Sequence, residues 1–159
     1  MRSSSFPICM AMICGMMPFT PVRAAPALAR CGASPAANKA VVLQFYALAF
    51  EDFKVREAFD RYADPSFIEH SEDTPGGTVA GTITFLQGLI DRFPHRKWKV
   101  VRSAADGDLV FLHVRFTSQP DKPATAISEI FRLKNCRLVE HWDVIAGPPD
   151  KVVNPNSRF

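Results

Sequence analysis

The residues best suited to chemistry lie in the run CRLVEHWDVIAG near the end of the chain, where His141 and Asp143 stand two positions apart. Side chains two positions apart on a strand share one face of a sheet. The preceding run, ATAISEIFRL, carries Glu129 among alternating aliphatic and aromatic residues. If the two faces meet, two carboxylates and an imidazole converge. That set is suited to moving protons between a bound molecule and the protein.

Two more histidines could join this group. His113 lies in the alternating run LVFLHVRFT, and His70 ends the short run SFIEH, where it shares a face with Ile68. The alternatives are that His141 and Asp143 face solvent on the outside of the sheet, and that His113 is a buried histidine with a structural role. The residues alone leave these readings open.

Other chemistries find little support in the sequence. His70, His113 and His141 with one carboxylate could bind zinc, but their spacing matches no H-E-x-x-H signature, so no metal is expected. The chain has no glycine-rich phosphate loop, no G-x-S-x-G nucleophile elbow and no recognisable cofactor motif. We therefore expect chemistry without a cofactor.

The elements that must position these side chains follow from periodicity. Apolar residues recur at helical spacing in three segments: NKAVVLQFYALAF, KVREAFDRY and ITFLQGLIDRF. Thr82 is placed to cap the third of these helices. A short strand, SFIEH, precedes the third helix, and four alternating segments joined by turns follow it. Helices segregated from an antiparallel meander indicate an α+β fold in which a curved sheet wraps around the helices and leaves a cavity.

The first 29 residues predict a secretory signal peptide, with a short apolar segment and the small-residue motif ALA at residues 27–29. A tether would follow over 30–37, and the folded domain would span 38–159, in a secreted or periplasmic protein. The apolar segment is too short to cross a membrane, so no membrane association is expected after cleavage. Without the leader's two arginines, the formal charge falls from +3 to +1, which argues against a nucleic-acid partner.

Cleavage would also change the cysteine count. Cys9 and Cys14 would leave with the leader, and Cys31 and Cys136 would remain in an oxidising compartment. Two cysteines in that setting favour a disulfide between them, with two unrelated thiols as the alternative.

Several segments together resemble a SnoaL-like domain, a group similar to polyketide cyclases within the nuclear transport factor 2-like superfamily. The resemblance spans about residues 38–159 and rests on FIEHSED, GTITFLQGLIDRFP, DGDLVFLHVRFT, ISEIFRLKNCRLVEHWDVI and NPNSRF. It implies a cone-shaped nuclear transport factor 2-like, or cystatin-like, fold with a small-molecule pocket. It also implies a homodimer through the outer sheet face, where we expect Leu138, Glu140, Trp142 and Val144.

The resemblance implies a function as well: a cofactor-independent cyclase, isomerase or aldol-type enzyme acting on a carbonyl compound. Asp143 corresponds to the acid/base aspartate of the last strand, with His141 as a second catalytic residue, and His70, Glu129 and His113 are expected to bind the substrate. His141 or His70 would donate to the developing enolate oxygen. Glu129 stands where this group more commonly has aspartate, and a secretory signal departs from the cytoplasmic cyclases. The alternative is a non-catalytic ligand-binding or dimerisation module of the same fold.

Overall fold

The structure, a computed structural model, describes residues 34–159 and begins with a long helix, α1 (Pro35–Tyr46). Ser34 caps this helix, because its side chain accepts a hydrogen bond from the backbone N–H of Ala37. Proline suits the first turn of a helix, where its missing N–H is not needed. The helix therefore starts three residues before Asn38, and the end of the expected tether is helical.

Two further helices follow. The chain continues from α1 into a π-helical turn, Ala47–Glu51, and then into α2 (Val55–Tyr62). The third helix, α3 (Val79–Arg92), begins earlier than expected, since Thr78 rather than Thr82 supplies the capping oxygen, to the N–H of Gly81. Thr82 lies within the helix and is buried, and its hydroxyl donates a hydrogen bond to the carbonyl of Thr78.

The sheet has five strands in the order β1-β5-β4-β3-β2. The last four form the predicted antiparallel meander: β2 (Lys97–Asp106), β3 (Leu109–Thr117), β4 (Thr125–Lys134) and β5 (Arg137–Ala146). The first strand, β1 (Ala63–Glu69), starts directly after α2 and pairs with β5 in parallel. The sheet is therefore mixed, whereas the sequence predicted an antiparallel one.

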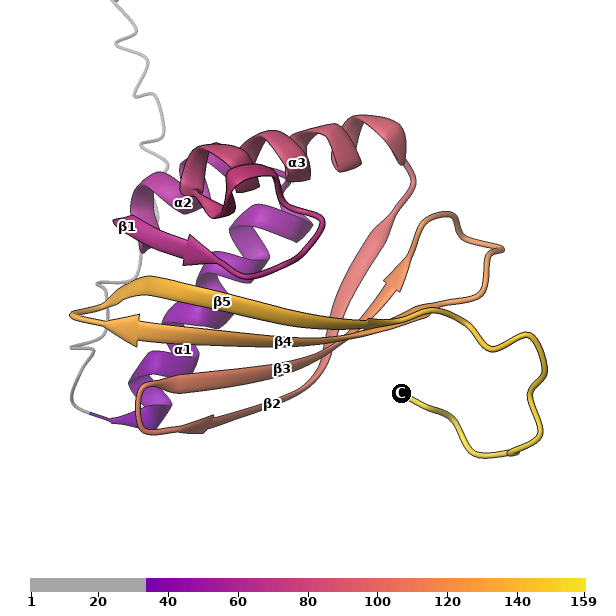
Figure 1. Cartoon of the computed structure of the whole chain (residues 1–159). Helices are drawn as coiled ribbons and strands as arrows, with labels where there is room; N and C mark the ends of the chain where they lie inside the picture. Colours follow the sequence, from indigo (N-terminus) through magenta and orange to yellow (C-terminus); the bar gives the residue numbers. More distant parts are fainter. Residues whose placement is uncertain (1–33) are drawn as a thin grey trace, which may run out of the picture.

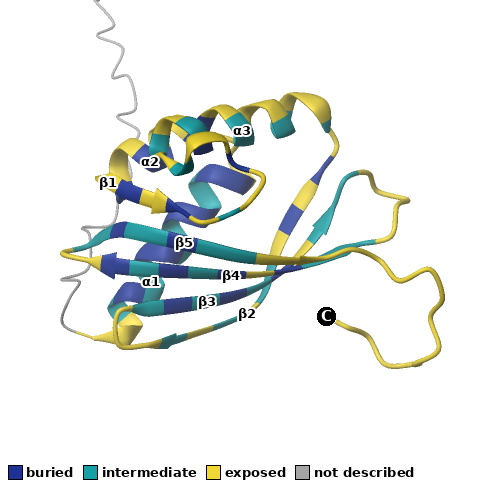
Figure 2. Ribbon diagram, in the orientation of Figure 1, coloured by how far each residue is buried: buried dark blue, intermediate teal, exposed yellow. Residues whose placement is uncertain are grey.

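The helices lie on one side of this curved sheet. Figure 1 shows α1 running along one face of the strands, with α2 and α3 beside the β1 edge. The buried positions of α1 and α2 pack with the inward-facing rows of the strands, seen as dark blue in Figure 2, into one hydrophobic core. Each strand presents alternate residues to this core, as β3 does with Val110, Leu112 and Val114. The predicted α+β architecture is confirmed.

Two details of β5 decide what reaches the core. The turn before it places Asn135 and Cys136 at φ of 50° and 72°, a left-handed pair typical of tight hairpins. A bulge follows, because Leu133 pairs with Leu138 while Arg132 pairs with Glu140, leaving one extra residue on β5. Leu138 is therefore fully buried and does not belong to the outer row in which the sequence analysis placed it.

The predictions for the amino terminus fall on residues 1–33, outside the described part of the chain. Cys136 is disulfide-bonded, but Cys31 lies outside the described residues, so the pairing of the two stays a prediction. The signal peptide and the secreted or periplasmic location also stay predictions. Within residues 34–159, no helix is long and apolar enough to cross a membrane.

Candidate functional site

Three neighbouring strands, β1, β5 and β4, together bring four polar residues to the inner face of the sheet. The parallel pairing of β1 with β5 aligns Glu69 with His141, and the antiparallel pairing of β4 with β5 aligns Phe131 with His141 and Glu129 with Asp143. Because partners across strands share a face, Glu69, His141, Glu129 and Asp143 all point inward. The register of β5 thus places an imidazole between two glutamates.

His141 bonds both glutamates. Its Nδ1 lies 2.7 Å from Oε1 of Glu69 and its Nε2 lies 2.7 Å from Oε2 of Glu129. Burial by itself lowers the pKa of His141, but the hydrogen bonds and charges of Glu129 and Glu69 outweigh burial and raise the pKa to about 10. His141 is therefore a cation that donates both of its N–H groups, and neither nitrogen is available to a ligand.

Each glutamate of this cluster accepts a second hydrogen bond. The Tyr46 hydroxyl donates to Oε1 of Glu129 at 3.0 Å, and the backbone N–H of Ser71 donates to Oε1 of Glu69 at 3.0 Å. Burial and the charge of Glu129 raise the pKa of Tyr46 well above its ordinary value, so the phenol stays protonated and donates. One imidazolium between two carboxylates leaves the cluster with a net charge of about −1 at neutral pH.

Asp143 stands beside this cluster, at the edge of the cavity. Burial in apolar surroundings and the charge of Glu129 raise its pKa, while the imidazolium of His141 and a hydrogen bond from the Ser71 side chain act the other way. The net result is a raised pKa, which brings the carboxyl closer to the pH at which it can both take and return a proton. Half-buried and facing open space, Asp143 can reach a bound molecule.

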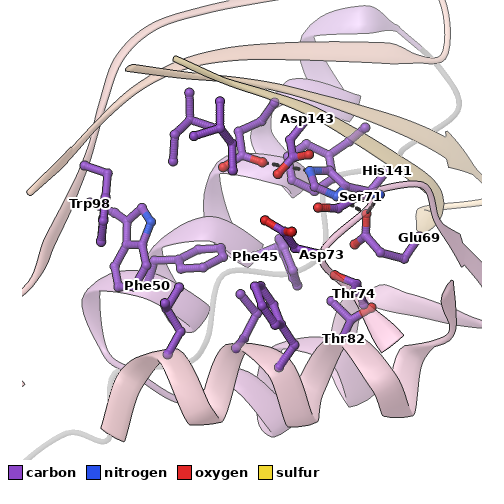
Figure 3. Close-up of a pocket in the computed structure, with 18 of the residues that line it drawn as sticks. Phe45, Phe50, Glu69, Ser71, Asp73, Thr74, Thr82, Trp98, His141 and Asp143 are labelled. Carbon is purple, nitrogen blue, oxygen red and sulfur yellow. Dashed lines mark hydrogen bonds and ion pairs between the residues drawn. The ribbon is translucent and has the colours of Figure 1, made fainter. Parts of the chain in front are cut away.

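The open space is a cavity of about 250 Å³ between the sheet and the helices. Figure 3 shows Asp143, Asp73 and Ser71 on one part of its wall and the indole of Trp98 on another. Most of the wall is apolar, and its aromatic side chains are Phe45, Phe50, Phe59, Phe67, Phe85, Trp98, Phe116 and Phe131. The π-helical turn contributes to this wall, because it carries Phe50. The ring centroid of Phe50 lies 4.3 Å from that of Tyr46.

Three of the sequence-predicted residues, Asp143, His141 and Glu129, meet in the cavity, and two do not. His70 is exposed on the outer face, where its ring stacks on that of Trp142 with 4.7 Å between the ring centroids and 1° between the ring planes. His113 also faces outward, where its Nδ1 is 3.0 Å from Nη1 of Arg102 and its ring stacks on Phe159. The predicted positions of His70 and His113 in the cavity are wrong, because in β1 and β3 the neighbouring residues, Glu69 and Leu112, face inward.

Glu69 and Tyr46 were not among the site residues predicted from the sequence. Glu69 directly precedes His70, the residue that was predicted to face the cavity. In a strand as short as β1, alternation alone does not decide which of the two neighbours faces inward. Tyr46 looked like an ordinary core residue on the apolar face of α1, with nothing nearby in sequence to suggest a partner for its hydroxyl. A signal did exist: the buried phase of β1 that starts with Phe67 includes Glu69.

The described residues offer no obvious metal centre. Over residues 34–159, no group of three or more histidine, cysteine, aspartate or glutamate side chains is arranged to hold a metal ion. The three histidines considered for zinc are separated, with His141 inside the sheet and His70 and His113 on the outer face.

A family model for the SnoaL-like domain matches residues 42–141. The structure is similar to AclR, a proposed hydroxylase from Streptomyces galilaeus, with a TM-score of 0.60, 26% identity, and coverage of 71% of this chain and 81% of that one. A proposed SnoaL-like polyketide cyclase from Jannaschia sp. CCS1 gives a TM-score of 0.57 at 21% identity, covering 68% of this chain and 84% of the other.

A third similar structure is a cystatin-fold protein from Novosphingobium aromaticivorans, with a TM-score of 0.57 at 14% identity, covering 67% and 97% of the two chains. Comparison with curated protein sequences gave no significant match. At these identities the second and third structures bear on the fold alone.

Proposed function

The chain belongs to the SnoaL-like domain family, and from this premise we propose that its cavity performs cofactor-independent acid/base chemistry on a small carbonyl compound. The observation that carries the proposal is Asp143, a carboxyl with a raised pKa on the wall of a mainly apolar cavity. Such a group is better suited than an ordinary aspartate to take a proton from a bound molecule and return it.

In the proposed reaction, the Asp143 carboxylate removes a proton from the carbon next to a carbonyl. The electron pair of that C–H bond forms the enolate double bond, and the carbonyl oxygen takes the negative charge. Either the Asp143 carboxyl then returns the proton to a different carbon of a conjugated enolate, which shifts the double bond and completes an isomerisation, or the enolate carbon attacks a second carbonyl of the substrate. In the second case the carboxyl protonates the new alkoxide, which completes an aldol closure.

The structure supports a different division of labour from the one predicted from sequence. His141 has both nitrogens bonded to glutamates, so we assign it a positioning role: it fixes the charge next to Asp143 and does not donate to the substrate. His70 is on the opposite face of the sheet. Ser71 lines the cavity, and its single O–H donates to the Asp143 carboxylate before reaction. Once Asp143 has taken the substrate proton, this hydroxyl is our proposed donor to the enolate oxygen.

The alternative, a non-catalytic module, is favoured if side chains plug the cone. The cavity of about 250 Å³ instead lies directly against Asp143, with room for a small molecule beside the titrating carboxyl. That arrangement supports an enzyme over a purely structural domain, although it would also serve a binding protein. Turnover must therefore be measured.

The test needs no knowledge of the natural substrate. A panel of small ketones and β-keto esters is incubated with the protein in D₂O, and exchange of the proton next to the carbonyl is followed by NMR. We expect enzyme-dependent exchange for at least one compound and a loss of about 10²–10⁴-fold in rate for Asp143→Asn. Asp150→Asn, on the exposed carboxy-terminal segment, is the matched control. Equal rates for the two variants, or no exchange above background for the whole panel, would contradict the proposal.

A further inference from the structure

We propose that the cavity selects small apolar ligands that carry a protonated amine and rejects carboxylates, with Asp73 at its mouth as the specificity-determining residue. The inference rests on the proposed function, since it names the class of substrate, an amine-bearing carbonyl compound, on which Asp143 would act. Three features of the cavity carry it: the charge of its wall, the position of Asp73, and the aromatic rings opposite.

The wall of the cavity carries excess negative charge. Four carboxylic acids line it, Glu69, Asp73, Glu129 and Asp143, and none of its lining residues within 34–159 is lysine or arginine. The one cation is His141, and both of its N–H groups are already bonded to glutamates. Because this excess charge acts on whatever enters the cavity, a bound carboxylate would be repelled and a bound ammonium attracted.

Asp73 is the carboxylate that remains free to meet a ligand. It belongs to the loop between β1 and α3, and Figure 3 shows its carboxylate pointing into the cavity. In the described part of the chain its side chain has no hydrogen bond or ion pair, whereas Glu69 and Glu129 each bond His141 and a second donor. An ammonium at the mouth can therefore pair with Asp73 without displacing an existing partner, and Asp143 stays available for chemistry.

The rest of the cavity suits the remainder of such a molecule. The rings of Phe45, Phe50, Trp98 and Phe116 line it, and aromatic faces attract cations as well as apolar groups. The volume, about 250 Å³, is near the lower end of the range for ligand pockets, which fits a body of one or two rings. Burying an ammonium away from water is costly unless a counter-charge is present, and Asp73 supplies one.

The test compares three probes of nearly equal shape by titration calorimetry at pH 7.5: 2-naphthylmethylamine, 2-naphthylmethanol and 2-naphthoate. We expect the amine to bind about tenfold more tightly than the alcohol and at least about a hundredfold more tightly than the carboxylate. In Asp73→Asn the amine should lose about five- to tenfold in affinity, while the affinity of the alcohol changes less than about twofold.

Glu72→Gln is the matched control, because Glu72 is the exposed neighbour in the same loop and does not line the cavity. The proposal is overturned if the amine binds no more tightly than the alcohol, if Asp73→Asn and Glu72→Gln behave alike, or if none of the probes binds. Its failure differs from that of the proposed function, since binding is measured here without turnover. Asp143-dependent proton exchange by a protein with no preference for amines would refute the charge selection alone.

Discussion

The pairing of β1 with β5 places two histidines on opposite faces of the same sheet, one buried in the protein and the other exposed to solvent. His141 faces inward, is bonded at both nitrogens to glutamates, and has a pKa of about 10. His70 faces outward, is exposed, and stacks flat on the ring of Trp142. Their backbones are joined directly, since the N–H of His70 donates to the carbonyl of His141 at 2.9 Å.

The difference teaches that position in the pleat, rather than residue type, decides what a histidine does here. Inside the sheet, burial would neutralise the imidazole, and only two carboxylates keep it charged. The same burial makes each of the three groups depend on the others, because a charge left alone in the interior is strongly destabilising. Outside the sheet, solvent is available and the stacked pair contributes modestly.

The largest effect should come from removing the inner histidine. In His141→Gln, Glu69 and Glu129 would face each other across the sheet without the cation between them, with side chains only 3% and 8% exposed. We expect the free energy of unfolding to fall by about 3–5 kcal/mol, measured by urea denaturation at pH 7.

The outer histidine provides the matched variant. His70→Gln should cost less than about 1 kcal/mol, since an exposed stack is lost and no buried charge is stranded. If the two substitutions destabilise the protein equally, the contrast between the faces is wrong.

The pH dependence of stability should show the same contrast. The pKa of His141 is raised from 6.5 to about 10, so its stabilisation is complete below pH 6.5 and is lost as the pH rises through 10. Urea midpoints should therefore fall across that window in the wild type and in His70→Gln. In His141→Gln the urea midpoint should fall less over the same pH range, because the imidazolium that loses its proton there is absent. A wild-type stability that is flat over this range would refute an imidazolium at this site.

A smaller effect should follow from Tyr46→Phe, which removes the hydroxyl that donates to Glu129 inside the protein. We expect a cost of about 1–2 kcal/mol, since a hydrogen bond to a buried charged group is lost. Tyr62→Phe is the control, because its hydroxyl makes a longer bond of 3.3 Å to Gln44 in a half-buried place and should cost less than about 1 kcal/mol. Equal costs would mean that the inner cluster does not depend on Tyr46.

Much of this fold could be predicted from the sequence, because its elements have clear periods and clear stops. The helical spacing of Val41, Val42, Phe45 and Tyr46 indicated α1, and the Asp-Gly turn at Gly107 marked the hairpin between β2 and β3. The parallel pairing of β1 was not predictable in this way. It depends on where a short strand docks in three dimensions, and no local pattern encodes that.

The site was only partly predictable for the same reason. Alternation in a long strand with an obvious core side placed His141 and Asp143 on one face, as the structure has them. It failed where both phases were plausible, as in β1 for Glu69 and His70, and where a bulge reversed the phase, as at Leu138. The partners of Tyr46 and Glu69 lie 83 and 72 residues away, so their bonds follow from tertiary packing alone.

The central claim, that Asp143 is a carboxyl tuned for proton transfer, is tested most directly by carbon NMR of the protein labelled at its aspartate carboxyls. Asp64 is the internal reference, because hydrogen bonds from Ser66 lower its pKa. The structure predicts that Asp143 titrates above the ordinary value of 3.8 and Asp64 below it. An Asp143 that titrates at or below 3.8 would contradict the account, since the carboxyl would then be an ordinary strand residue with no special capacity to carry a proton.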